Sequence, residues 1–144
     1  MPISNLSIYH NIATESYSNL KFRIEKEKIS KEGGSNGHAI NYDPDLNTFR
    51  QSMITIVFAG MWLEQNIYEE ILSRTGLDIV RRYNSKEYRE WLIRLEIVSA
   101  EVLDEIDAFM SAREILMNST IVNDKSIETA QKEASRAQRI IASI

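Results

Sequence analysis

The chain has 144 residues, of which 43% are hydrophobic and 26% are charged, a composition typical of one globular domain and not of a disordered segment. It contains no cysteine, which excludes disulfides, thiolate nucleophiles and cysteine-bound metals. The net charge of −4 does not favour nonspecific binding of nucleic acid over the whole surface, although a local basic cleft is compatible with it.

Nothing in the sequence predicts a membrane segment. Residues 1–11 lack the basic start and apolar core of a signal peptide. The longest apolar run, residues 53–63, is shorter than the roughly 20 residues that span a bilayer. We therefore expect a cytoplasmic protein without membrane contact, and the absence of cysteine fits a reducing compartment.

Residues 5–32 show the pattern of a first helix. Apolar residues lie three or four positions apart on one stripe, namely Tyr9, Ala13, Tyr17, Leu20 and Ile24. A glycine-rich loop, residues 33–47, follows this helix. His38 lies in the loop near Asp43 and Asp45, but no paired histidine spacing accompanies it. We therefore predict neither a metal site nor a cofactor there.

Residues 49–72 form the segment around which the rest of the chain is expected to pack. The first half, residues 53–63, is apolar on nearly every side, which is typical of a helix buried against several neighbours. The second half narrows to one apolar face, made of Leu63, Ile67, Tyr68, Ile71 and Leu72.

Three further residues define this second helix. Asn47 or Thr48 is expected to cap its start, because a short polar side chain there accepts a hydrogen bond from a free backbone N–H. Gly76 is expected to end it. Gly60, near its middle, is expected to let another helix approach closely.

A third helical pattern begins at Asn84 or Ser85 and runs past Ala112 without proline or glycine. We expect a break within it, because helices longer than about 25 residues are uncommon in compact domains. Its apolar face consists of Tyr88, Trp91, Leu92, Leu95, Val98 (or Ile97), Val102, Ile106, Phe109 and Met110. Asp104, Glu105 and Asp107 form an acidic cluster. We predict that it is a solvated helix face and not a set of metal-binding carboxylates.

The last helix is expected to be capped by Asp124 or Ser126. Its small-residue seam, which suits docking on the second helix, consists of Ile127, Ala130, Ala134, Ala137 and Ile141. Solubilising charge is expected on its other faces, at Lys132, Arg136 and Arg139. The periodicity as a whole predicts an all-α bundle with one domain, residues 1–144.

Residues 109–120 read FMSAREILMNST and precede a turn and a final amphipathic helix. This order resembles the HEPN superfamily, compact bundles of four to five helices in bacterial defence, toxin–antitoxin and nucleotide-linked systems. In that family an Arg, often followed by a polar residue, precedes a His after four to six positions, just before the last helix. Arg113 matches the Arg, Glu114 the polar residue and residues 115–117 the apolar spacer. The resemblance implies a four- to five-helix bundle with long antiparallel helices.

The sequence departs from the family at the position of the His, where it has Asn118. Thr120 stands where a subset of toxins has Tyr. In the family's RNases the His takes part in proton transfer and the Arg steadies the phosphate. Asparagine can hydrogen-bond to a phosphate or a base but has no group that titrates near neutral pH, which general acid–base catalysis needs. The resemblance therefore implies an RNase-type scaffold with a degenerate motif, whose candidate binding residues are Arg113, Glu114 and Asn118.

Three hypotheses follow. The first is a non-catalytic homodimer that binds RNA or a nucleotide between Arg113 and Asn118 of both copies, in a toxin–antitoxin or defence system, with a nucleotidyltransferase-like antitoxin as a partner. The second is a metal-independent endoribonuclease toxin, either active through another group or inactivated at Asn118. The third is a helical adaptor without nucleotide chemistry, with the aromatic contact surface Tyr68, Tyr83, Tyr88 and Trp91.

An unrelated helical bundle is the alternative to the family resemblance. Under that alternative, Arg113 is an ordinary helix-end cation, which the helix dipole favours near a C-terminus. Asn118 is then a C-cap or turn residue, because asparagine tolerates left-handed backbone angles.

Overall fold

The computed structural model describes residues 5–33, 47–82, 84, 87–120 and 122–144, with the backbone alone described for residues 26–33. These ranges contain helices and no strand, so the all-α prediction is confirmed for them. The six helices are α1 (Asn5–Gly33), α2 (Asn47–Thr75), α3 (Leu77–Val80), α4 (Tyr88–Arg94), α5 (Ala100–Asn118) and α6 (Asp124–Ser143). The loop predicted at residues 33–47, with His38, lies outside the described residues except at its two ends.

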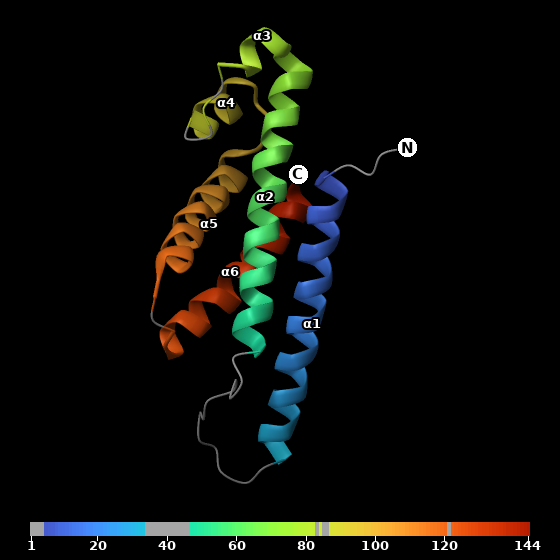
Figure 1. Ribbon diagram of the computed structural model, residues 1–144, viewed down its shortest axis with the longest axis vertical. Coiled ribbons are helices and arrows are strands. Elements are labelled where there is room, and N and C mark those ends of the chain that lie inside the picture. The colour runs from blue at the N-terminus through green and yellow to red at the C-terminus, as the bar shows by residue number, and fades with distance from the viewer. Residues whose placement is uncertain (1–4, 34–46, 83, 85–86, 121) are drawn as a thin grey trace.

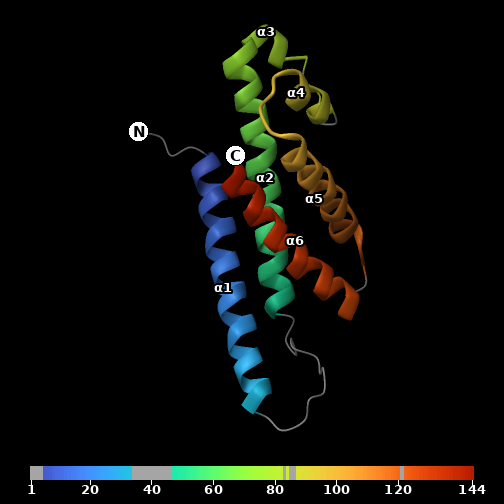
Figure 2. The same cartoon turned by 180° about the vertical axis from the view of Figure 1, so that it is seen from behind.

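Helix α2 is the centre of the fold, as its all-round apolar sequence predicts. It contacts each of the other helices. Helix α1 lies along one side of it and runs in the opposite direction, and α5 lies on the other side (Figure 1). Helix α6 crosses α2 obliquely between α1 and α5, as the view from behind shows (Figure 2). The short helices α3 and α4 lie at the C-terminal end of α2.

Small side chains bring α1 and α2 close together. Ala13 and Ser16 of α1 are buried, as are Thr55 and Ala59 of α2. The hydroxyl oxygens of Ser16 and Thr55 lie 2.8 Å apart and share a hydrogen bond, which satisfies two polar groups that would otherwise be costly to bury. On the predicted stripe of α1, Leu20 is also buried, and Tyr9, Tyr17 and Ile24 pack against the core at its edge.

The alanine seam of α6 faces the core as predicted. Ala130, Ala134 and Ala137 are almost completely buried, and α6 packs against α2 and α5. Alanine side chains allow the helix backbones to approach closely, and the larger Ile140 closes the contact at the C-terminal end. The sequence pattern placed Ile141 in this seam, but Ile141 is only partly buried.

The predicted break in the third helical pattern lies at residues 95–99, between α4 and α5. Glu96 has a φ of 52°, a left-handed conformation that ends α4. Ser99 then caps α5, where its hydroxyl accepts a hydrogen bond from the Val102 backbone N–H at 3.3 Å. Helix α4 itself begins at Tyr88, later than the start predicted at Asn84 or Ser85.

Two predicted caps differ from the structure. The N-cap of α6 is Asn123, whose side chain accepts a hydrogen bond from the Ser126 backbone N–H at 2.9 Å. It was predicted to be Asp124 or Ser126, but all these polar residues are acceptable caps, so composition alone did not separate them. At the start of α2, Asn47 is already helical. The predicted stop at Gly76 is confirmed: α2 ends at Thr75, and Gly76 has a φ of 97° that suits glycine.

The helices of the described ranges contain no stretch with the length and hydropathy that a membrane crossing would require.

Candidate functional site

Arg113 lies at the contact between α5 and α2, directly over Gly60. A Cβ atom built on Gly60 would lie 2.3 Å from the Nε atom of Arg113 and 2.6 Å from its Cζ atom. Only glycine therefore leaves room for the guanidinium in this position. The sequence predicted that Gly60 would allow a close approach, and the group that approaches is the Arg113 side chain.

The Arg113 guanidinium forms an ion pair with Glu64, one helical turn after Gly60. A terminal nitrogen of Arg113 donates a hydrogen bond to Glu64 Oε1 at 3.2 Å. The Arg113 side chain is 16% exposed and that of Glu64 is 46% exposed. Within the described part of the chain, the buried Nε atom of Arg113 has no hydrogen-bond partner. The Arg113 side chain thus packs against Gly60, and its guanidinium pairs with the Glu64 carboxylate.

The other two candidate residues do not converge with Arg113 in one chain. Glu114 and Asn118 are both exposed, and Asn118 is the last residue of α5. Since each residue of an α-helix turns by about 100°, Arg113 and Asn118 lie about 140° apart around the α5 axis. Ser119, not Asn118, is the C-cap. A site that needs both residues therefore requires a contribution from elsewhere.

An apolar pocket opens beside the end of α5, and the sequence analysis did not predict it. Its volume is about 280 Å³, and it is lined by Phe49, Met53, Leu116, Met117, Ser119, Val122 and Ser126. The neighbouring side chain of Ile115 is 71% exposed, and Met117 and Val122 are also exposed. The available signal was the run of three apolar residues at 115–117, because one helix face cannot bury all three.

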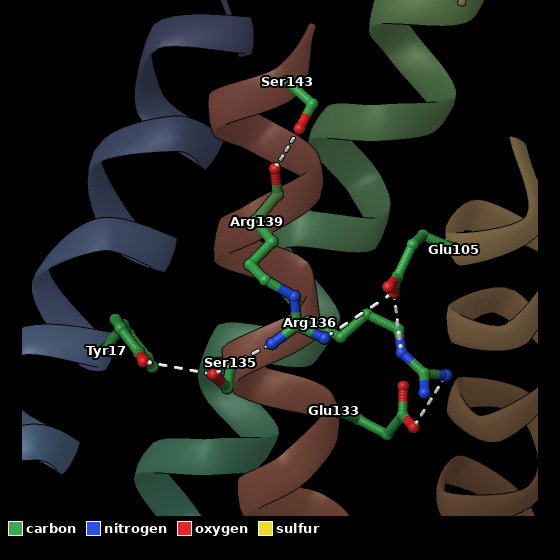
Figure 3. A network of polar contacts seen from close by, with 7 residues as sticks. All are labelled: Tyr17, Glu105, Glu133, Ser135, Arg136, Arg139 and Ser143. Atoms are coloured by element: carbon green, nitrogen blue, oxygen red, sulfur yellow. Dashed lines mark hydrogen bonds and ion pairs between the residues drawn. The ribbon is translucent and has the colours of Figure 1, made fainter. Parts of the chain in front are cut away.

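A second polar cluster joins α5 to α6 (Figure 3). Glu105 of α5 pairs with Arg136 at 3.0 Å and with Arg139 at 3.6 Å, and Arg136 also pairs with Glu133 at 3.1 Å. Tyr17 of α1 donates a hydrogen bond to Ser135 at 3.4 Å, which brings a third helix into the cluster. The prediction that Arg136 and Arg139 serve only as solubilising charge is therefore wrong, because both bind Glu105 across the helix contact.

Glu133 is the buried member of this cluster, with a side chain that is only 5% exposed. One of its carboxylate oxygens binds Arg136, and the other has no hydrogen-bond partner among the described residues. Burial raises the pKa of Glu133, and the positive charges of Arg136, Lys132 and Arg139 oppose that shift only in part, while Glu105 adds to it. The carboxyl group is thus placed where its ionisation is disfavoured.

A smaller cavity of about 240 Å³ lies next to this cluster and is lined by Glu101, Val102, Glu105, Arg139, Ile140 and Ser143. Two of its three charged residues, Glu105 and Arg139, already bind each other. The cavity therefore offers a ligand few free polar groups.

The acidic cluster of α5 is not a simple solvated face. Asp107 accepts a hydrogen bond from the Tyr88 hydroxyl at 2.5 Å and forms an ion pair with Arg89, so it ties α4 to α5. Glu105 binds α6, and of the three acidic residues only Asp104 is exposed. In the ranges that the structure describes, no group of three His, Cys, Asp or Glu side chains could hold a metal ion.

The predicted aromatic contact surface is not an exposed patch. Tyr68, Tyr88 and Trp91 are partly buried and pack against the core, whereas Tyr83 lies outside the described residues.

Comparisons of the chain with protein-family models, curated proteins and solved structures found no match.

Proposed function

We propose that this protein is a HEPN-like helical domain that binds the phosphate groups of RNA or of a nucleotide without cleaving them, as a component of a bacterial toxin–antitoxin or defence system. The observation that carries the proposal is the fixed position of Arg113 on Gly60, near the end of the penultimate long helix. A guanidinium presents several donors in one plane, which suits a phosphate. The long helices α1, α2, α5 and α6 fit the four- to five-helix bundle of that family.

The proposed assembly is a two-fold dimer in which both copies contribute to one groove. Arg113 and Asn118 diverge around α5 in a single chain, so a site that uses both is completed by the second copy. Exposed apolar side chains lie beside each of them on α5: Met117 is about 40° from Arg113 around the helix axis and Ile115 about 60° from Asn118. Both supply surface for such a contact, and two-fold pairing uses the same surface twice.

Light scattering tests the assembly. We expect the full chain to be a dimer and Ile115→Glu to shift it toward the monomer, because a charge at the contact would have to be desolvated. Ile93→Glu is the matched control, since Ile93 is also exposed but lies on α4. A monomer at all concentrations, or equal effects of both substitutions, would contradict the proposed contact.

Binding of a fluorescent single-stranded RNA or of ATP tests the ligand. We expect Arg113→Ala to weaken binding of the probe that the protein recognises, since a charge-assisted hydrogen bond contributes about 1.5–3 kcal/mol. Arg81→Ala, which removes an exposed cation at the end of α3, serves as the control. Equal affinities of Arg113→Ala and the unmodified chain would reject the proposed role of Arg113.

A helical adaptor without nucleotide chemistry is the second candidate. The observation that favours it is the apolar pocket at the end of α5, which opens beside the exposed Met117 and Val122. Such pockets accept an apolar anchor from a partner helix. In this case Met117→Glu would abolish partner binding while Arg113→Ala would not, and neither RNA nor ATP would bind.

A further inference from the structure

The ion pair between Arg113 and Glu64 occupies one of the two terminal nitrogens of the guanidinium. The Cδ, Nε and Cζ atoms of Arg113 lie against Gly60, so the Nε edge faces the protein. Of the terminal donors, one already binds Glu64 Oε1. The Arg113 side chain is 16% exposed and that of Glu64 is 46% exposed, so the carboxylate is the more accessible member of the pair.

We propose that Glu64 is an internal competitor for the anion at Arg113, so that a phosphate group binds by displacing the Glu64 carboxylate. This inference rests on the proposed phosphate-binding function. Carboxylate and phosphate oxygens accept the same hydrogen bonds from a guanidinium. With the Nε atom buried, only the terminal nitrogens are left for a phosphate, and Glu64 already binds one of them. The negative charge of Glu64 also repels an approaching phosphate.

The geometry gives Glu64 only a small structural role, so the ion pair can break when a ligand binds. An ion pair with a half-exposed partner contributes only about 0.2–1 kcal/mol to folding. The Glu64 side chain can therefore rotate toward solvent without loss of the core. A ligand that must first break this pair loses the same energy, which corresponds to an affinity lower by a factor of about 1.4 to 5. Glu64 is thus a positioning residue that sets the affinity of Arg113 for anions.

The test compares Glu64→Gln with the unmodified full chain. Glutamine keeps the size of the side chain and removes its charge. Binding of a twelve-nucleotide single-stranded RNA and of ATP would each be measured by fluorescence at low and at moderate salt. We expect Glu64→Gln to bind more tightly by a factor of about 1.4 to 5 at low salt, with a smaller gain at moderate salt because the repulsion is screened. A gain with RNA alone, or with ATP alone, identifies the source of the phosphate.

Two further variants make the comparison specific. Glu70→Gln removes a glutamate that forms an ion pair with Arg74 at 3.2 Å on the same helix, and we expect it to leave the affinity unchanged. Glu64→Asp keeps the charge and should restore an affinity close to that of the unmodified chain. A merely structural role of Glu64 would change the melting temperature without this pattern of affinities.

The outcomes separate the inference from the function on which it rests. If binding depends on Arg113 but Glu64→Gln binds no more tightly than the unmodified chain, the competitor role is wrong and the phosphate-binding function stands. If neither the unmodified chain nor Glu64→Gln binds RNA or ATP, or if Arg113→Ala does not abolish that binding, both proposals fail.

Discussion

Gly60 and Arg113 are fitted to each other across the contact of α2 and α5, because the arginine side chain occupies the space of the Cβ atom that glycine lacks. We predict that Gly60→Ala displaces the guanidinium and breaks its ion pair with Glu64 while the fold persists. The obstacle is a flexible side chain, which can rotate away. Alanine also favours a helix over glycine by about 1 kcal/mol, so the free energy of unfolding should not fall. Urea unfolding and RNA binding measure the two effects.

The control for Gly60→Ala is the same substitution in an Arg113→Ala background. There the added methyl group meets no arginine, so the full helical gain of about 1 kcal/mol is expected. If Gly60→Ala instead lowers the free energy of unfolding in either background, the backbone of α2 and α5, and not the arginine, fills the space next to Gly60.

Glu133 should give the protein a pH-dependent loss of stability. Burial raises the pKa of Glu133 in the folded state above its ordinary value, so the folded state binds more protons than the unfolded state at pH values between the unfolded and the folded pKa. Stability from this group is complete below the unfolded pKa and is lost as the pH rises through the folded pKa. We expect Glu133→Gln to remove this part of the pH dependence in urea unfolding measured from pH 4 upward.

The comparison for Glu133 is Glu128→Gln, which replaces an exposed glutamate of the same helix. As the pH rises, the free energy of unfolding of Glu133→Gln should increase relative to that of the unmodified protein. The free energy of unfolding of Glu128→Gln should not show this relative increase. Parallel stability curves for Glu133→Gln and the unmodified protein would show that burial of this carboxyl group has no energetic consequence.

The helices could be predicted from the sequence because their patterns are local. Spacing of three and four residues identified the core positions Leu20, Ile67 and Ala134, and Gly76 marked the end of α2. The break near Glu96 was expected from length alone. Its position could not be located, because a non-glycine residue with a positive φ carries no sequence signal.

The site was only partly predictable, because its contacts join distant parts of the chain. Arg113 was selected through a motif, but its partner Glu64 is 49 positions earlier, and no local pattern connects them. The same holds for Glu105 and Arg136, which looked like surface charges on separate helices. Pairings of this kind depend on how α2, α5 and α6 pack, and that packing is set by the whole core.

Glu96 offers a direct route to a more stable protein. Its φ of 52° is unfavourable for residues with a Cβ atom and is readily adopted by glycine. The residue is exposed, so its side chain can be removed without opening the core. We predict that Glu96→Gly raises the free energy of unfolding by about 0.5–1 kcal/mol, because the left-handed conformation costs a residue with a Cβ atom about 1–2 kcal/mol and glycine loses only about 0.5–1 kcal/mol more backbone entropy on folding. Lys132→Gly, at an exposed position inside α6, should instead lower it by about 1 kcal/mol; a loss with both would contradict the prediction.

Asn118→His tests whether the chain is an RNase that lacks only its proton-transfer group. Asn118 is exposed at the end of α5, so an imidazole fits there without disturbing the core. We expect the variant to cleave single-stranded RNA in the presence of a metal chelator, with a rate that depends on pH around the ordinary histidine pKa of about 6.5. Cleavage should disappear in Asn118→His with Arg113→Ala, and Thr120→His, which adds an imidazole two residues later, should be inactive. If Asn118→His binds RNA but does not cleave it, the scaffold is a binding domain whose inactivity has more than one cause.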